Sequence, residues 1–368
     1  MQFRRVVVGV DFSEASLTAA RWVATHFAPE AEIVLVHVLP EPRVPSYLRA
    51  ELPPAIDIAA TMAPSLYGGL HGLAELVGGD RARIDILIGN PPDALARAAA
   101  EEGADLICVG RGRRRRGSAR FGATTAQRLL ARTRVPTVVV PATRPGASSH
   151  IIAAVDERVG GRAVLEVACG LAAAAEARLE ALHVVEAEVQ AFVSAAREAL
   201  APHDLPPGEG AAAPALDAGA PLRAGSVRER ALAWLHSMLW DVTGGAGRVS
   251  AALGAGDPAE EIIRRAHEGD ADLIVIGRGG DASHESAPAG ALPLGSTTRF
   301  VLWTAPCPAL VLPLDPSRAL TAPSPERGAR HQRETVEPAV IELRGSPREH
   351  AGPLPPAARQ EQAQGGAA

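Results

Sequence analysis

The chain has 368 residues and a formal net charge of −5, and all 37 of its Lys+Arg residues are arginine. The absence of lysine excludes a Walker A phosphate site, a Schiff base and a catalytic amine. Its mild acidity argues against a nucleic-acid-binding protein. Three widely separated cysteines without a C-x-x-C pair favour reduced thiols, and no apolar run suits a signal peptide or a membrane span. We therefore expect a cytoplasmic protein without membrane association.

Short β-branched runs in the first part of the chain predict buried strands. These runs cover residues 6–10, 33–38, 84–88, 106–109 and 137–140. They lack polar alternation, which is typical of a parallel sheet covered on both faces.

Helical patterns lie between these strands. Ala20, Val23, Ala24 and Phe27 follow the spacing i, i+3, i+4, i+7, and Ser13 is a candidate N-cap. The same spacing recurs at Val164, Val167, Ala168 and Leu171.

The sequence contains an internal repeat. Residues 89–112 align without gaps onto residues 256–279, with 12 identities in 24 positions at an offset of 167. The run VVVGVD at 6–11 matches IIAAVD at 151–156, and RVPTVVVP at 134–141 matches APCPALVLP at 305–313. The chain is therefore interpreted as a tandem duplication.

The alternation of strands and helices predicts an α/β fold, with two tandem Rossmann-like, doubly wound domains, each with a parallel five-stranded sheet. We expect domains at 1–145 and 146–316, a surface loop within 202–226, and a disordered tail at 317–368, which is rich in proline and charge.

Candidate ligand residues follow the first and fourth strands of each copy. Open α/β sheets bind ligands outside the carboxyl ends of their strands, where the strand order reverses. Asp11 and Asp156 end the first strands, and VGRG at 109–112 and IGRG at 276–279 end the fourth. A new helix is predicted after each glycine segment, near 123–125 and 295–297. Glycine backbone and a helix N-terminus suit phosphate groups.

The order of these motifs resembles the universal stress protein family over both copies. That resemblance implies an ATP site built on a G-x2-G-x9-G-[ST] pattern, with the strand-one aspartate and a residue after strand two at the adenine end. The implied nucleotide-binding residues are Val10, Asp11, Val38, Gly110, Gly112, Gly122, Thr124 and Thr125 in the first copy, and Val155, Asp156, Val184, Gly277, Gly280, Gly295, Ser296 and Thr297 in the second.

Both copies depart from the pattern's spacing. In the first copy, strict spacing from Gly110 places Arg113 at the second glycine, whereas Gly112 and Gly122 have the nine-residue separation with Thr124 one position late. In the second copy the glycines and Ser296 are present, but 14 residues separate Gly280 from Gly295.

Several of these residues can have a structural role instead of a ligand-binding or catalytic one. Asp11 and Asp156 can cap the following helix, and we interpret His37 and His183 as buried, hydrogen-bonded histidines rather than catalytic ones. We interpret the run Arg113 to Arg116 as a solvated loop, with phosphate binding as the alternative.

The functional prediction is a regulatory protein that binds ATP and is not an enzyme. The sequence contains no G-x-S-x-G and no H-E-x-x-H motif, and we predict no catalytic residue and no metal site. The alternatives are an interaction module without nucleotide binding and, less favoured, a weak ATPase.

We expect two kinds of protein contact: one with an unidentified protein partner, and one through the last strand of each copy. The resemblance implies pairing through residues 137–140 and 309–312, either within one chain or in a homodimer, which would hide the sheet edges.

Overall fold

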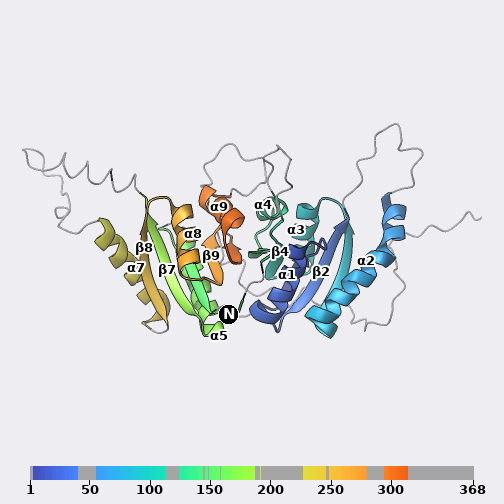
Figure 1. Cartoon of the computed structure of the whole chain (residues 1–368), viewed down its shortest axis with the longest axis horizontal. Helices are drawn as coiled ribbons and strands as arrows, with labels where there is room; N and C mark the ends of the chain where they lie inside the picture. The colour runs from blue at the N-terminus through green and yellow to red at the C-terminus, as the bar shows by residue number, and fades with distance from the viewer. Residues whose placement is uncertain are drawn as a thin grey trace, which may run out of the picture. The chain divides into compact units, whose positions relative to one another are not determined.

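Each half of the chain builds a five-stranded parallel sheet with helices on both faces (Figure 1). This computed structural model describes residues 3–39, 55–112, 124–143, 146–147, 149–157, 159–186, 191, 227–245, 248–279 and 294–313. The first half runs through β1 (Arg5–Gly9), α1 (Glu14–Trp22), a π-helical turn η1 (Val23–Phe27), β2 (Glu32–Leu39), α2 (Ala55–Val77), a 3-10 turn η3 (Gly79–Arg81), β3 (Ala82–Ile88), α3 (Pro91–Glu101), β4 (Leu106–Gly110), α4 (Thr125–Leu130) and β5 (Thr137–Val140). The second half runs through β6 (His150–Ala154), α5 (Val159–Ala175), β7 (Arg178–Val185), α7 (Val227–Thr243), β8 (Val249–Ala255), α8 (Pro258–Glu268), β9 (Leu273–Gly277), α9 (Ser296–Thr304) and β10 (Ala309–Leu312).

The strands form one sheet in the order β3-β2-β1-β4-β5-β10-β9-β6-β7-β8. All pairings within a half are parallel, whereas β5 and β10 pair antiparallel, with Leu310 opposite Val138. The predicted doubly wound α/β fold is confirmed, and the two last strands pair with each other within one chain. This pairing removes both of those sheet edges from solvent.

Alternate residues of each strand pack into two separate cores. Val6 and Val8 of β1 belong to the cluster that includes side chains of α1 and α2, whereas Val7 belongs to the cluster that includes side chains of α3 and α4. The second half repeats this arrangement with α5 and α7 on one face and α8 and α9 on the other. Helices on both faces explain why the strands carry apolar residues without alternation.

The first helix begins as predicted and continues into a π-helical turn. Ser13 is the N-cap and its side chain accepts a hydrogen bond from the N–H of Ser16. The predicted helical pattern, which includes Phe27, is helical throughout: α1 ends at Trp22 and a π-helical turn follows directly, in which the N–H of Ala28 donates to Val23 O at 2.7 Å. The wider turn brings the Phe27 ring into a stack on Trp22, with centroids 4.8 Å apart.

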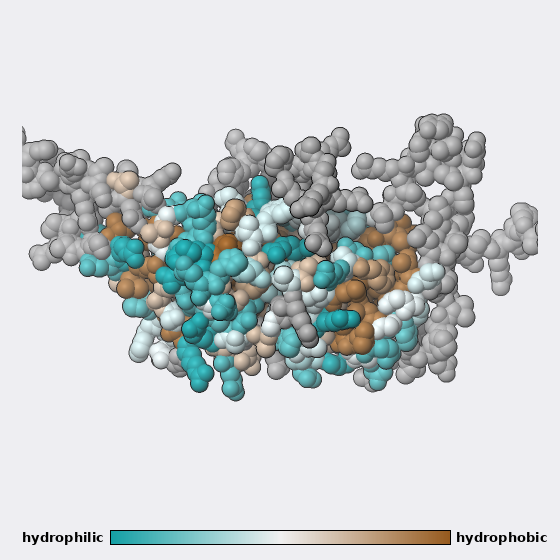
Figure 2. Space-filling model, viewed as in Figure 1, coloured by the Kyte–Doolittle hydropathy of each residue, from teal (hydrophilic) through white to brown (hydrophobic). Residues whose placement is uncertain are grey.

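Some predictions fall on residues outside the described ranges. They are the loop within 202–226, the tail at 317–368, the run Arg113 to Arg116, and the two glycines Gly122 and Gly280. Among the helices that are described, none has the length and apolarity of a membrane span. On the face shown in Figure 2, hydrophilic residues cover much of α8, whereas hydrophobic residues gather near α2.

Candidate functional site

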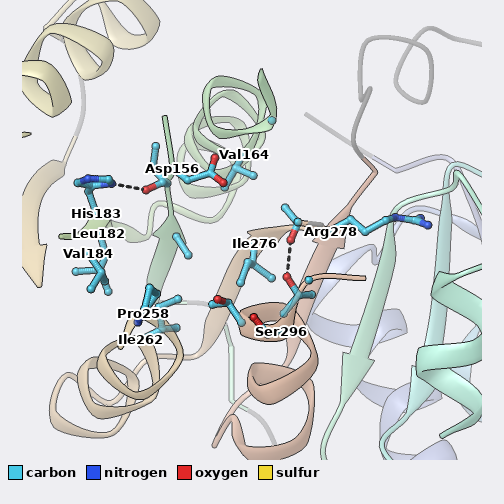
Figure 3. A pocket seen from close by; sticks show the side chains of 18 of the residues that line it. Asp156, Val164, Leu182, His183, Val184, Pro258, Ile262, Ile276, Arg278 and Ser296 are labelled. Atoms are coloured by element: carbon cyan, nitrogen blue, oxygen red, sulfur yellow. Dashed lines mark hydrogen bonds between the residues drawn. The ribbon is translucent and has the colours of Figure 1, made fainter. Parts of the chain in front are cut away.

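A cavity of about 750 Å³ lies in the second half, where the carboxyl ends of β6 and β9 meet (Figure 3). The strand order reverses between these two strands, because β6 leads to β7 and β8 on one side while β9 leads to β10 on the other. This is the switch point at which open α/β sheets bind ligands. The volume is within the range of small-molecule and cofactor sites.

One part of the cavity is apolar. It is lined by side chains from α5, β7, α8 and β9, among them Val164, Leu182, Val184, Ile262 and Ile276. Three carboxylate residues that follow β6 and β7 also line the cavity: Asp156, Glu157 and Glu186. This lining suits a flat apolar group that carries hydrogen-bonding substituents.

The other part is formed by the segment Gly277–Gly279 and the N-terminus of α9. Gly279 has φ +61°, and the N–H of Gly295 donates to Arg278 O at 3.1 Å. The hydroxyl of Thr298 donates to Gly277 O at 2.8 Å. These two bonds fix the glycine segment against the helix start, so the first N–H groups of α9 lie at the cavity wall.

The N-terminus of α9 has no side-chain cap. Its N-cap is Gly295, which offers no side chain to accept from the first turn. The first N–H groups of an α-helix have no partner within the helix, and the helix dipole adds partial positive charge there. Arg299 lines the same part of the cavity, as does Arg278, although the guanidinium of Arg278 is bonded to carbonyl groups of the first half. This part of the cavity is therefore positive and rich in hydrogen-bond donors.

Seven of the eight residues predicted for the second copy line this cavity, and the eighth, Gly280, lies outside the described residues. The seven are Val155, Asp156, Val184, Gly277, Gly295, Ser296 and Thr297.

The corresponding helix start in the first half differs. Thr124 is the N-cap of α4, and its side chain accepts from the N–H of Gln127, while Gln127 Oε1 accepts from the N–H of Thr124 at 3.1 Å. This capping box occupies donors that remain without a side-chain acceptor in α9. Thr124 and Thr125 therefore begin a helix that is capped by its own side chains.

The other predicted residues of the first half have structural contacts. Asp11 Oδ1 accepts from the N–H of Ser13, and although burial acts to raise the pKa of Asp11, this bond and those involving Ser16 hold it below its ordinary value. Val10 is buried, and its N–H donates to Val36 O. Val38 lies in β2 and Gly110 ends β4, with Gly112 two residues beyond the strand.

The two predicted strand-end histidines have equivalent partners in both halves. His37 Nδ1 lies 2.7 Å from Val10 O, and His183 Nδ1 lies 2.9 Å from Val155 O. Each imidazole therefore connects the second strand to the residue before the strand-one aspartate. The predicted hydrogen bonds are confirmed, but both histidines are half-buried and not buried as expected. Phe12 covers the His37 ring, whereas Trp234 of α7 covers that of His183.

Sequence reasoning missed Val164, Ile262, Arg278 and Arg299 as lining residues. Val164 and Ile262 belong to ordinary helical core patterns, so nothing distinguishes them in the sequence. Arg278 had a signal, because arginine stands at the same place in both copies, as Arg111 and Arg278.

Comparison with known proteins gives a consistent family assignment. A profile of the universal stress protein family matches residues 2–141 and again 148–313. A universal stress protein from Archaeoglobus fulgidus DSM 4304 aligns over 84% of this chain and 98% of its own, at 15% identity and a TM-score of 0.55. A functionally unknown protein from Pseudomonas aeruginosa PAO1 aligns over 84% and 92%, at 18% identity and a TM-score of 0.50.

A universal stress protein in complex with cAMP aligns over 39% of this chain and 100% of its own, at 21% identity and a TM-score of 0.27. A comparison with curated protein sequences gave no significant match. The structural likenesses concern the fold, and the double profile match covers most of the sequence. The chain belongs to the universal stress protein family.

Proposed function

We propose that this protein binds ATP in the second half and acts as a regulatory nucleotide-binding protein rather than as an enzyme. The observation that carries the proposal is the uncapped N-terminus of α9, which lies beside Gly277–Gly279 at the donor-rich end of an apolar cavity. The adenine would lie on the apolar lining, and the phosphates would meet the helix N-terminus.

The absence of lysine determines how the phosphates would be held. Backbone N–H groups of the glycine segment and of α9 would supply the main contacts, with the hydroxyls of Ser296 and Thr297 and the guanidinium of Arg299 beside them. Asp156 lies at the other end of the cavity, where a carboxylate would accept hydrogen bonds from the nucleoside.

The test is a calorimetric titration of the full chain with MgATP, in the wild type and in two matched variants. Gly295→Asp introduces a carboxylate at the N-cap of α9, where Gly295 has φ −60° and ψ 154°, a conformation open to aspartate. That carboxylate would cap the helix and repel phosphate, so we expect an affinity loss of about tenfold or more. Thr124→Asp introduces the same residue at the N-cap of α4.

We expect one ATP per chain, with the affinity of the Thr124→Asp variant unchanged. Equal losses in both variants, or two equivalent sites, would contradict the assignment to the second half. Absence of saturable binding by the wild type would contradict the function itself and favour the alternative, an interaction module without nucleotide.

The chemistry of the site supports a regulatory role. Within the described part of the chain, the residues around the donor-rich end are glycines, hydroxyls and arginines, which can bind a phosphate chain by positioning and charge. Steady release of phosphate from ATP by the purified protein would favour the weak ATPase instead. The cytoplasmic location and the domain boundaries at 145 and 316 remain predictions from the sequence.

A further inference from the structure

Arg278 reaches out of its own half of the chain. It follows β9 directly, is 1% exposed, and extends away from the cavity toward the first half (Figure 3). Its Nη1 donates to Leu130 O, the last residue of α4, and its Nη2 donates to Thr133 O. Both acceptors are carbonyl groups at the C-terminal end of a helix, where a cation is electrostatically favoured.

Arg111 makes the reciprocal contact. It occupies the equivalent position of the repeat, and its Nη1 donates to Ala305 O at 2.6 Å. Ala305 is the C-cap of α9. Each glycine segment is thus bonded, through one arginine, to the C-terminal end of the helix that follows the glycine segment of the other half.

The buried guanidinium of Arg278 depends on its hydrogen bonds to the first half. Within the described residues it forms no ion pair, and its Nε has no hydrogen-bond partner. Burial, together with the charge of Arg134, lowers the pKa of Arg278 to about 10, so the guanidinium remains charged at neutral pH. A buried cation without a carboxylate is costly, and the two carbonyl groups of the first half are what offset that cost.

The backbone of the same residue belongs to the candidate ligand site. Arg278 O accepts from the N–H of Gly295, at the start of α9, and the residue lies between the two glycines of the cavity wall. A ligand at Gly277–Gly279 and the bonds to α4 therefore stabilise one and the same conformation of this segment. Two events that favour the same conformation are coupled, and the coupling acts in both directions.

We propose that Arg278 is a positioning residue that couples occupancy of the cavity to the contact between the two halves, so that ligand binding in the second half tightens the end of α4 in the first. This inference rests on the proposed nucleotide binding.

The test is hydrogen exchange of the full chain, with and without saturating MgATP. The reporters are the amides of Ala131, Arg132 and Thr133, which donate to carbonyls of Gln127 and Leu129 at the end of α4. In the wild type we expect ATP to slow their exchange by about fivefold, the lower end of common coupling factors. In Arg278→Met, at ATP concentrations that restore saturation, we expect this slowing to disappear while the start of α9 is still protected.

The matched control is Arg111→Met, which removes the reciprocal contact and weakens the same junction between the halves. We expect it to keep the slowing at residues 131–133, so that a general loosening of the junction is separated from the role of Arg278. If Arg278→Met does not fold, Arg278→Lys is the variant to test. The single ammonium group of lysine cannot bond two carbonyl groups as the guanidinium of arginine does. We then expect a reduced slowing.

Unchanged slowing in the Arg278 variants, or none in a wild type that binds ATP, would overturn the inference and leave the proposed function standing. A wild-type protein that does not bind ATP would contradict both this inference and the proposed function.

Discussion

The two halves have the same fold, but they differ in how the helix after the glycine segment is capped at its N-terminus. In the first half, Thr124 and Gln127 form a capping box that uses the helix's own donors. In the second, Gly295 leaves α9 without a side-chain cap, beside a cavity of about 750 Å³. The comparison shows that, in a duplicated scaffold, one copy can cap a helix start with its own side chains while the other leaves it without a side-chain cap.

The largest expected difference between the halves concerns the first glycine of each segment. A Cβ at Gly110 would lie 2.5 Å from backbone atoms of Ala15 and Ser16, whereas a Cβ at Gly277 meets only Val164, at 3.6 Å. We expect Gly110→Ala to lower the free energy of unfolding by about 3 kcal/mol and Gly277→Ala by less than about 1 kcal/mol, measured by urea denaturation. Equal losses would mean that the two segments are packed alike.

The next difference separates stability from binding. Thr124→Ala removes the capping box and should cost about 1 kcal/mol of unfolding free energy, with ATP affinity unchanged. Ser296→Ala, at the first position of α9, should leave stability within about 0.5 kcal/mol and raise the Kd for ATP several-fold, since one hydrogen bond contributes about 1 kcal/mol. Thermal unfolding and calorimetric titration of both variants would test this crossed pattern, and a reversed pattern would contradict it.

The smallest expected effect concerns the strand-one aspartates. The hydrogen bond from Ser13 helps to hold the pKa of Asp11 below its ordinary 3.8, so its contribution to stability is present above that pH and is lost as the pH falls through the lower, folded-state pKa. We expect Asp11→Asn to cost less than about 0.5 kcal/mol at pH 7, because the side chain is exposed, and less still once the pH falls below the lowered pKa of Asp11.

Asp156→Asn should act on the ligand instead. Asp156 lines the cavity, so the variant should weaken ATP binding severalfold at pH 7 while the unfolding midpoint changes little. Denaturation at pH 7 and pH 2, with titration at pH 7, would compare the two variants. A loss of ATP affinity in Asp11→Asn would place a ligand in the first half as well.

The sequence predicted most of the fold because its local signals agree with one another. The strand at 137–140 was predicted with the bounds it has in the structure, and Ser13 caps α1 as expected. The helical pattern at Ala20, Val23, Ala24 and Phe27 is confirmed, but the spacing did not indicate that Val23–Phe27 form a π-helical turn that stacks Phe27 on Trp22.

The candidate site was predicted in part. Gly277, Ser296 and Asp156 could be found because strand ends meet at a switch point in any doubly wound sheet. Val164 and Ile262 could not, because an apolar residue in a helix has the same sequence pattern whether it lines a core or a cavity.

By itself, the sequence determined the duplication, the α/β class and the absence of lysine from any ligand site, because repeats, periodicity and composition can be read directly from the chain. Only the tertiary structure decided how the halves differ. The close approach at Gly110 and the contact of Arg278 with α4 depend on atoms brought together from distant positions. The repeat makes the two halves alike in sequence, but packing at these points makes them different in structure.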